Sequence, residues 1–471
     1  MKLHRALLIL FSLSITLYFL LIAQGCANMI PPSGGPRDSL PPTLVNVNPS
    51  DSARNFGGKK ITFVFDEFVQ LDNVQANVLI SPTPKVFPTI NARLRTLTVD
   101  LKDTLEPNTT YTIDFGNAIR DINEQNAIRN FTYLFSTGSS LDSFELTGKV
   151  ILAESGETDS TLIVLLHRNL DDSAVIKERP RYRARLDGNG NFRFRNLPAG
   201  TFAVYALKDE GSGMYLQKTQ LFAFLQAPVT INSSTEPVTL FAYSAPDPRP
   251  TTPAARAITV RTSPSAQERR LRLDANLVDG ELDLLKNLEI NFPSAPLKYF
   301  DSSKVRFVNE NFSPLTGYRY LRDTSNQKIS LQYNWVANTQ YHLIVDKDFA
   351  EDSSGRKLLK LDTLSFKTRK ENEYGEVRLR FPNIDLQKNP VLLFMQNNSI
   401  AHTHIFTSNT FNARLFRPGE YELRILYDEN KNGKWDPGEF FTMRRQPEKV
   451  LSIPRRVIIK PNWLNEVDIN L

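Results

Sequence analysis

The chain has 471 residues, a net charge of +6 and a single cysteine, and 41% of its residues are hydrophobic. This length is too great for one ordinary domain, so several modules are predicted. With one cysteine, internal disulfides are excluded and each module must be held by packing. A weakly basic balance does not by itself indicate nucleic acid, and we expect no nucleic-acid partner.

The N-terminal 25 residues have the pattern of a secretory signal peptide. Lys2 and Arg5 precede an apolar run, and Gly25-Cys26 follows it. A small residue directly before a cysteine at this place resembles the lipobox of bacterial lipoproteins. The resemblance implies that Cys26 carries a diacylglycerol on sulfur and a fatty acid, typically palmitate, on the new N-terminus, and several acyl chains anchor stably. The alternative is a membrane helix with an incidental cysteine.

The chain after Cys26 is predicted to be all-β. Residues 26–40 are rich in Pro and Gly and predict an extended tether. From residue 41 onward, apolar and polar residues alternate in short runs such as 60–69, 96–101 and 131–137. Alternation with a period of two places one face of a strand in a core and the other in water. Short, regularly spaced strands of this kind predict tandem β-sandwich modules.

Two interleaved sequence repeats divide the chain. Pro107–Tyr111 is echoed by Ala337–Tyr341, and Phe192–Asp209 aligns without a gap on Phe411–Asp428. Repeats at these positions predict the module order A-B-A′-B′. A Pro-rich stretch at 246–256 falls at the join between the two halves and predicts a stiff linker.

The two kinds of module resemble known β-sandwich families. Pro41–Pro49, Ile61–Glu67 and Phe135–Gly138 are similar to the SbsA-like bacterial Ig-like domain of the S-layer type. Leu146–Val150 and Gly190–Phe202 are similar to transthyretin-like, or carboxypeptidase-regulatory-like, domains. Together with the lipobox, the chain resembles Ig-like-domain lipoproteins of Bacteroidetes. Folds of this kind host many functions and say little about role.

These observations give the expected module boundaries. They are a lipoprotein signal peptide at 1–25, a tether at 26–40, an Ig-like domain at 41–140, a transthyretin-like domain at 141–245, a linker at 246–256, a divergent Ig-like domain at 257–371 and a transthyretin-like domain with a calcium-type loop at 372–471.

The sharpest local motif is a twelve-position calcium loop at residues 428–439. Such loops place oxygen side chains at positions 1, 3, 5 and 9, Gly at 6 and Glu at 12, so that six or more oxygens converge on Ca²⁺. The flanking segments Tyr421–Tyr427 and Glu439–Met443 are strand-like, so this loop would join strands rather than helices. The predicted ligands are Asp428, Asn430, Asn432, the carbonyl of Lys434, Asp436 and Glu439.

Other interpretations of polar motifs stay open beside this one. Residues 428–439 are also compatible with a polar β-turn in which Asn and Gly adopt positive φ. The equivalent loop in the first B module keeps Asp209 but lacks most ligands, and we predict no metal there. His402 and His404 share a strand face, but the sequence supplies no third ligand for a transition metal.

The sequence predicts a non-catalytic protein. No zinc-peptidase histidine pair, no Gly-x-Ser-x-Gly elbow and no phosphate-cradling loop is present. We expect an envelope lipoprotein that acts as a structural or interaction module for an unidentified envelope protein. The expected location is the outer membrane, lipid-anchored and facing the periplasm, with surface exposure as an alternative.

The alternative function is that of a glycan-binding accessory lipoprotein in polysaccharide capture. Exposed aromatic side chains near the calcium-type loop would carry that activity, and Trp435 and Trp463 are the candidates. Core or loop packing of both rings is the competing interpretation.

Overall fold

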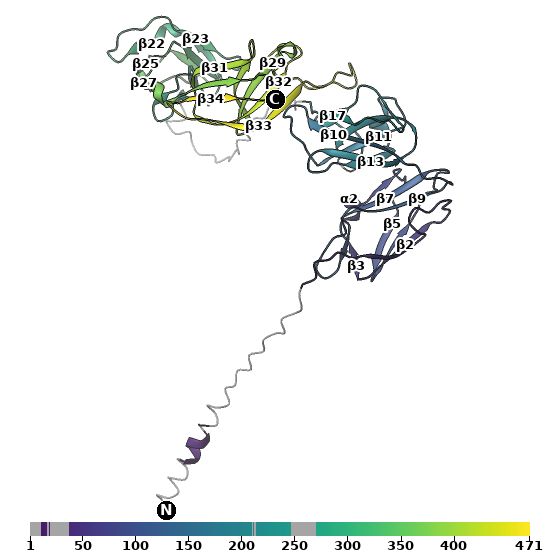
Figure 1. The fold of residues 1–471 in the computed structure, drawn as a ribbon. Coiled ribbons are helices and arrows are strands. Elements are labelled where there is room, and N and C mark those ends of the chain that lie inside the picture. The colour runs from purple at the N-terminus through teal and green to yellow at the C-terminus, as the bar shows by residue number, and fades with distance from the viewer. Residues whose placement is uncertain (1–10, 17, 19–36, 210, 212, 246–269) are drawn as a thin grey trace, which may run out of the picture. The chain divides into compact units, whose positions relative to one another are not determined.

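The computed structural model describes residues 11–16, 18, 37–209, 211, 213–245 and 270–471 (Figure 1). Cys26 and the predicted linker at 246–256 lie outside the described residues. The chain divides into two compact units, Met1–Leu141 and Asp142–Leu471. Within the described parts, no helix combines the length and the apolar character needed to cross a bilayer.

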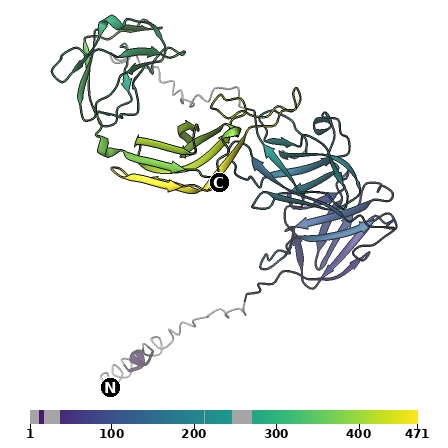
Figure 2. The same cartoon turned by 45° about the horizontal axis from the view of Figure 1, so that its top comes forward.

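The predicted all-β class is confirmed: strands dominate the described residues, in tandem β-sandwich modules (Figures 1 and 2). Helical elements are short. Residues 11–16 are helical, and the helical elements after residue 37 are α2 (Val74–Asn77), α3 (Ala174–Lys177), η1 (Ser302–Lys304), η2 (Glu371–Glu373) and η3 (Leu386–Lys388).

The first unit has a four-stranded sheet in the order β1-β2-β6-β5, a three-stranded sheet β4-β7-β9 and the pair β3-β8. Its core is aromatic, with Phe63, Phe115 and Phe135 fully buried. Their positions follow the alternation in the sequence, since Ile61, Phe63 and Phe65 face inward from β2. The strands are β1 (Leu44–Asn48), β2 (Lys60–Phe65), β3 (Val69–Leu71), β4 (Leu79–Ser81), β5 (Thr89–Arg93), β6 (Thr96–Asp100), β7 (Thr110–Gly116), β8 (Ile119–Asp121) and β9 (Phe131–Ser136).

The second unit begins with a module of two sheets, β13-β10-β17 and β12-β11-β14-β15, with β16 paired to β14. Strands β10 and β17 run parallel. The strands are β10 (Phe144–Leu152), β11 (Leu162–His167), β12 (Tyr182–Arg185), β13 (Asn191–Leu197), β14 (Gly200–Lys208), β15 (Phe222–Phe224), β16 (Val229–Ile231) and β17 (Val238–Ala242).

The next strands repeat the arrangement of the first unit. Their sheets are β18-β20-β24-β23, β19-β27-β25-β22 and the pair β21-β26. The strands are β18 (Asp274–Ala275), β19 (Glu281–Leu282), β20 (Leu288–Asn291), β21 (Leu297–Phe300), β22 (Val305–Asn309), β23 (Arg319–Arg322), β24 (Lys328–Gln332), β25 (Gln340–Val345), β26 (Ala350–Asp352) and β27 (Asp362–Thr368).

The last strands repeat the second module, with sheets β31-β28-β34 and β30-β29-β32-β33 and a parallel pair β28-β34. The strands are β28 (Gly375–Arg380), β29 (Pro390–Gln396), β30 (Ser399–Ile405), β31 (Thr410–Phe416), β32 (Gly419–Tyr427), β33 (Lys449–Ile459) and β34 (Leu464–Asp468).

The sequence repeat of the A modules corresponds to a repeated hydrogen-bond cluster. The Thr137 hydroxyl accepts the Thr109 N–H at 3.0 Å, and the Thr368 hydroxyl accepts the Thr339 N–H at 2.9 Å. The Tyr111 hydroxyl accepts the N–H of Glu106, and the Tyr341 hydroxyl accepts the N–H of Val336. In both modules the donor lies two residues before the repeated Asn. Conserved spacing in the two echoed segments therefore fixes the same corner twice.

Candidate functional site

The predicted calcium-type loop joins β32 to β33, and its hydrogen bonds follow the sequence motif. The Asp428 carboxylate is buried and accepts the N–H of Asn432 at 3.2 Å and of Gly433 at 2.6 Å. Gly433 has φ +74°, a left-handed conformation that glycine adopts without steric cost. Each Asp428 oxygen keeps a lone pair for a further partner. The turn therefore closes on the Asp428 carboxylate through backbone N–H groups.

The two asparagines of the loop use both ends of their amides. Asn430 Oδ1 accepts the N–H of Asn432 at 3.0 Å, and Asn432 Oδ1 accepts the N–H of Lys434 at 2.7 Å. Their Nδ2 groups both donate to Asp436 Oδ2 at 2.6 Å. These two donors lower the pKa of Asp436. Asp428, Asn430, Asn432 and Asp436 are thus linked by hydrogen bonds within one turn.

Glu439, the predicted twelfth ligand, has a different set of contacts. Its Oε1 accepts the hydroxyl of Thr442 at 3.2 Å, and its backbone pairs with Arg445 at 2.8 and 2.7 Å. Across the described residues, no group of three or more His, Cys, Asp or Glu side chains is placed to hold a metal ion. A cation in this loop would therefore depend on the Asn430 and Asn432 oxygens and on backbone carbonyls as well as carboxylates.

Glu448, which the sequence motif does not include, lies inside the loop. It is 4% exposed, and its carboxylate accepts the N–H of Glu429 and of Asp436, each at 2.9 Å. Burial raises its pKa, with the Asp428 charge adding to the effect. The loop is therefore folded around a buried carboxylate that follows position 12 by nine residues in the printed sequence. A template of twelve positions cannot find it.

In the equivalent loop of the second module, the aspartate that corresponds to Asp428 pairs with a guanidinium. The Asp209 carboxylate forms an ion pair with the Arg183 guanidinium and accepts the N–H of Gly211 and Gly213. A neighbouring guanidinium competes with any bound metal ion for the same oxygens. The two repeats thus share a turn but not its electrostatic surroundings.

The segment after the loop differs from the expected strand. Residues 437–447, here termed the docking segment, form a turn closed by the bridge between Glu439 and Arg445. Phe440 is 3% exposed and packs in a core cluster of the second module, with ring centroids 4.9 Å from Phe224 and 5.1 Å from Phe222. Its apolar character serves this long-range contact rather than a local strand, which corrects the strand-like expectation.

Arg444 holds the same segment by polar contacts. Its guanidinium forms an ion pair with Asp172 and donates to the carbonyl of Leu225 at 3.1 Å. The guanidinium carbon also lies 5.2 Å from the ring centroid of Phe440. The Gln446 side chain donates to the Phe224 carbonyl at 3.0 Å. Two modules far apart in the sequence are therefore joined by aromatic packing and charge-assisted hydrogen bonds.

A second contact joins the same modules at β33. The Val450 N–H donates to the Ala153 carbonyl at 2.9 Å, and Arg424 pairs with Glu157 at 2.9 Å. A Cβ atom added at Gly156, whose φ is +72°, would lie 2.6 Å from the Ser452 nitrogen. The close backbone approach therefore requires glycine at this position.

The structure places the two candidate glycan-binding tryptophans differently. Trp435 is partly buried in the packing of two core clusters, and its Nε1–H donates to the Glu448 carbonyl at 2.8 Å. Trp463 is 64% exposed, with Lys460 Nζ 5.3 Å from its ring centroid. Only Trp463 of the pair offers an open ring face.

The two histidines of β30 lie against aromatic rings. His402 is 5.2 Å from the ring centroid of Phe416, and His404 is 4.9 Å from that of Phe411. Burial lowers the pKa of both imidazoles. These contacts show a packing role for the shared strand face.

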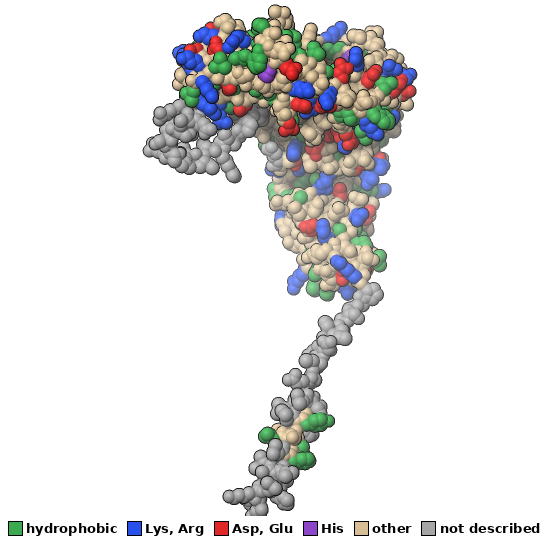
Figure 3. All heavy atoms as spheres, turned by 90° about the vertical axis from the view of Figure 1, so that its left-hand side faces the viewer, with side chains coloured by type: hydrophobic (Ala, Val, Ile, Leu, Met, Phe, Trp, Pro, Cys, Tyr) green, Lys and Arg blue, Asp and Glu red, His purple; other side chains and the backbone are tan. Residues whose placement is uncertain are grey.

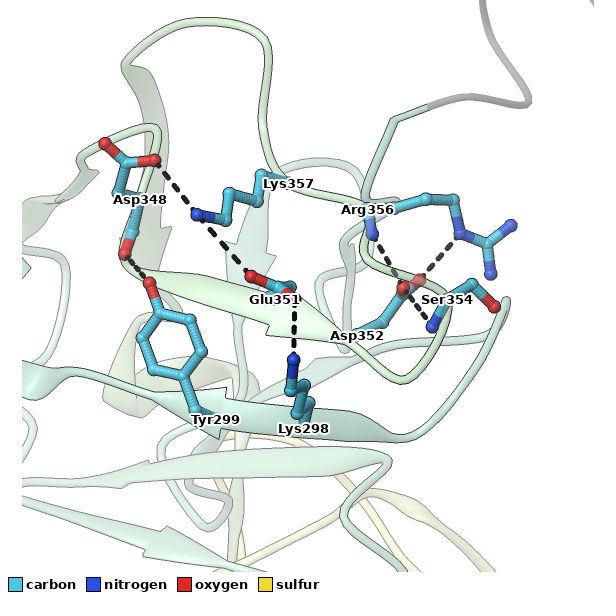
Figure 4. Close-up of polar contacts among 8 residues, drawn as sticks. All are labelled: Lys298, Tyr299, Asp348, Glu351, Asp352, Ser354, Arg356 and Lys357. Carbon is cyan, nitrogen blue, oxygen red and sulfur yellow. Dashed lines mark hydrogen bonds and ion pairs between the residues drawn. The ribbon is translucent and has the colours of Figure 1, made fainter.

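Another polar cluster lies at β21 and β26 (Figure 4). Asp352 is fully buried, accepts the N–H of Ser354 and Arg356 at 2.9 Å each, and pairs with Arg356 Nε at 2.7 Å. Glu351 lies between Lys298 and Lys357, at 3.3 and 3.5 Å. These carboxylates are matched by cations and N–H groups, so the cluster anchors a turn. In the first unit, Asp121 caps the corresponding turn.

The comparisons with known proteins identify one module. Residues 38–137 match the family model of the bacterial Ig-like domain, which agrees with the resemblance seen for 41–140. No curated protein matches the chain.

Three solved structures illustrate the remaining likenesses. The TIE protein of Bacillus anthracis is 11% identical, with 93% of this chain and 76% of that chain covered and a TM-score of 0.17. The major pilin subunit BcpA of Bacillus cereus is 9% identical, with 70% and 99% covered and a TM-score of 0.17. The N-terminal part of the bacterial S-layer protein SbsC is 14% identical, with 44% and 45% covered and a TM-score of 0.16. Likenesses of this strength say nothing about the role of this chain.

Proposed function

We propose that this chain is a non-catalytic lipoprotein of the bacterial outer membrane, anchored through acyl chains on Cys26. It acts as a structural arm that presents β-sandwich modules to a protein partner in the periplasm. The transthyretin-like modules would serve as the rigid part of that arm. The lipobox-like residues before Cys26 and the Ig-like match at 38–137 support this role.

The observation that carries the proposal is the docking segment. Burial of a phenylalanine side chain of this kind contributes roughly 1.5–3 kcal/mol, and Phe440 is 3% exposed in the core cluster of another module. Arg444 adds an ion pair and hydrogen bonds to backbone carbonyls. A spacer arm needs modules that keep a fixed mutual position, and a shared core supplies it.

Charge on the surface is compatible with protein contacts. Figure 3 shows Lys and Arg side chains interspersed with Asp and Glu over the face in view. Mixed charge of this kind favours specific pairing with a complementary protein surface over generic attraction to a polyanion.

We propose further that residues 428–439 bind Ca²⁺ through Asp428, Asn430, Asn432, the Lys434 carbonyl and Asp436, with Glu439 as the twelfth-position ligand. The turn geometry of Asp428 and Gly433 supports this. Binding would replace the two amide donors on Asp436, and it would require Glu439 to leave Thr442. The cation would offset the buried negative charge of Glu448 and Asp428.

Two experiments test the proposal. Metabolic labelling with a radiolabelled fatty acid should mark the chain, and Cys26→Ser should abolish the label. A C-terminally tagged, lipidated chain should then recover an outer-membrane protein in stoichiometric amount from solubilised envelopes. Loss of that protein in chelator would place the last module at the contact. Labelling of the Cys26→Ser variant, or recovery of the lipoprotein alone, would contradict the proposal.

A further inference from the structure

One outer sheet face of the first unit carries polar side chains in a regular grid. On β6, Thr96, Thr98 and Asp100 alternate with the buried Leu97 and Val99. The register places Arg93 opposite Thr96 and Asn91 opposite Thr98 on β5, and Lys60 opposite Asp100 on β2. From Thr96 to Asp100 the grid extends about 13 Å along the strand.

This face carries a shallow, open depression. The grid and the loops at its end line a depression of about 610 Å³. That size lies within the range of small-ligand sites. Seven of the nine lining residues carry hydroxyl, amide or charged groups, although apolar atoms supply the larger part of the lining surface. Such a mixture suits a ligand with both polar groups and apolar faces. All the strands that carry the lining belong to one sheet, so the groups are held on a rigid support.

The rim holds exposed apolar groups. Phe68 is 48% exposed, and the Arg95 guanidinium lies 5.6 Å from its ring centroid. Leu94 is 62% exposed and has φ +56°, in the two-residue turn between β5 and β6. Asn or Gly adopts this conformation at lower cost, so the fold alone does not favour leucine here. Backbone outliers of this kind concentrate at ligand-binding sites.

The charges of the depression are unbalanced. Lys60, Arg93 and Arg95 face a single carboxylate, Asp100. Within the described part of the chain, no ion pair engages any of these three cations. Arginine presents a planar fork of donors that matches carboxylate and phosphate oxygens.

We propose that this depression binds an anionic oligosaccharide. Arg93 and Arg95 would hold the acidic group, the Phe68 ring would pack on the apolar face of a sugar ring, and Thr96, Thr98 and Asn91 would bond to its hydroxyls. Asp100 would accept hydroxyl protons at the far end. The proposal does not depend on lipidation or on a protein partner, and it uses neither Trp435 nor Trp463.

A saccharide fits these residues better than a nucleic acid does. Single-stranded nucleic acids are bound by several stacked aromatic rings along a continuous basic groove. Here the rim offers one ring, and Asp100 would repel a phosphate backbone running along the grid. Hydroxyl-rich surfaces beside one aromatic ring suit a ligand that has many hydroxyls and few charges.

The test uses the full chain in detergent and isothermal titration with four probes. They are a tetramannoside carrying a terminal glucuronate, a tetramannoside carrying a terminal phosphate, the neutral tetramannoside and a short single-stranded oligothymidylate. Binding of either anionic sugar, at least tenfold tighter than the neutral one and weakened by salt, is expected. The first two probes distinguish carboxylate from phosphate as the recognised group.

Variants assign the binding to the depression. Arg93→Ala with Arg95→Ala should weaken the anionic sugar at least tenfold, and Arg129→Ala, an exposed cation outside the lining, should not change it. Leu94→Asn should raise the melting temperature of the first unit while weakening binding, which separates the site from folding. Equal affinity for the neutral sugar, tighter binding of the oligonucleotide, no effect of the arginine variants, or no binding of either anionic sugar at millimolar concentration would each overturn the proposal.

Discussion

Arg444 forms an ion pair with Asp172, which precedes it by 272 positions in the chain. The same guanidinium donates to the carbonyls of Leu225 and Gln226 and lies over the Phe440 ring. One side chain therefore ties the docking segment to two parts of the second module, Asp172 and the segment Leu225–Gln226.

Replacing Arg444 with Ala should open the contact between the two modules. Hydrogen bonds from charged donors contribute about 1.5–3 kcal/mol each, so we expect a local loss of about 2 kcal/mol in the opening free energy of β15. Hydrogen exchange of the β15 amides measures it, and β6 in the first unit is the internal reference. Arg444→Lys keeps the positive charge but lacks the planar set of guanidinium donors, so it should restore only part of the lost opening free energy. Unchanged exchange in β15 would show that the segment does not hold the module.

Replacing Phe440 with Ala should have a larger effect. Truncating a buried phenylalanine costs about 3–5 kcal/mol, and Phe440 is 3% exposed. Its neighbour Phe441 is 42% exposed and provides a matched control, for which we expect less than about 1 kcal/mol. Limited proteolysis within 437–447 should be faster in the Phe440 variant alone. Equal cleavage of the two variants would contradict the insertion of Phe440.

Calcium should bind the loop of the last module and not the corresponding loop of the second. Asp428→Ala should abolish calcium binding measured by titration calorimetry, whereas Asp209→Ala should leave it unchanged because Arg183 already occupies that carboxylate. Chelation should also raise hydrogen exchange in residues 428–439. Calcium binding that survives Asp428→Ala would assign the ion to another site.

The second module should lose stability in mild acid. Burial lowers the pKa of His167 to about 4, and the Glu178 charge opposes this only in part. An unfolded histidine titrates near about 6.5, so between these values the unfolded chain binds a proton that the folded chain does not. The neutral, buried imidazole therefore makes its full contribution to the free energy of unfolding above the unfolded pKa. This contribution is lost as the pH falls, and the loss reaches ~2 kcal/mol at about pH 5.

A His167→Phe variant tests this dependence. Its second module should be less acid-sensitive between pH 7 and 5 in hydrogen exchange of β11 and β14. The described residues of the first unit contain no histidine, so its exchange should change less over the same interval. An unaltered pH profile in the variant would attribute the acid response to other groups.

Features encoded by contiguous residues were predictable. The Thr109 and Thr339 corners were found as sequence echoes, because the turn, the hydroxyl and the tyrosine lie within a few positions. The polar turn at Asp428, Asn430 and Asn432 is likewise a local feature, because its hydrogen bonds join residues within a few positions of one another. Calcium binding by this turn stays a prediction.

Contacts between distant segments were not predictable from local pattern. Gln446 meets the carbonyl of Phe224 across 222 positions. Glu448 lies beyond the twelve positions of the motif, and Phe440 was assigned to a strand because alternation does not reveal which core an apolar residue enters. Long-range packing determines where these side chains lie, and it overrides the strand tendency of the local sequence.

Phe440 completes the aromatic cluster of the second module, so this cluster is incomplete until residue 440 has been synthesised. Chains are synthesised from the N-terminus, and domains generally fold in that order. Until the docking segment arrives, the surface formed by Phe222, Phe224 and Tyr243 lacks the ring that covers it. A chain terminated before residue 437 would expose an aromatic, aggregation-prone surface, which proteases and chaperones recognise. This aromatic surface therefore stays uncovered until residues 437–447 have been synthesised.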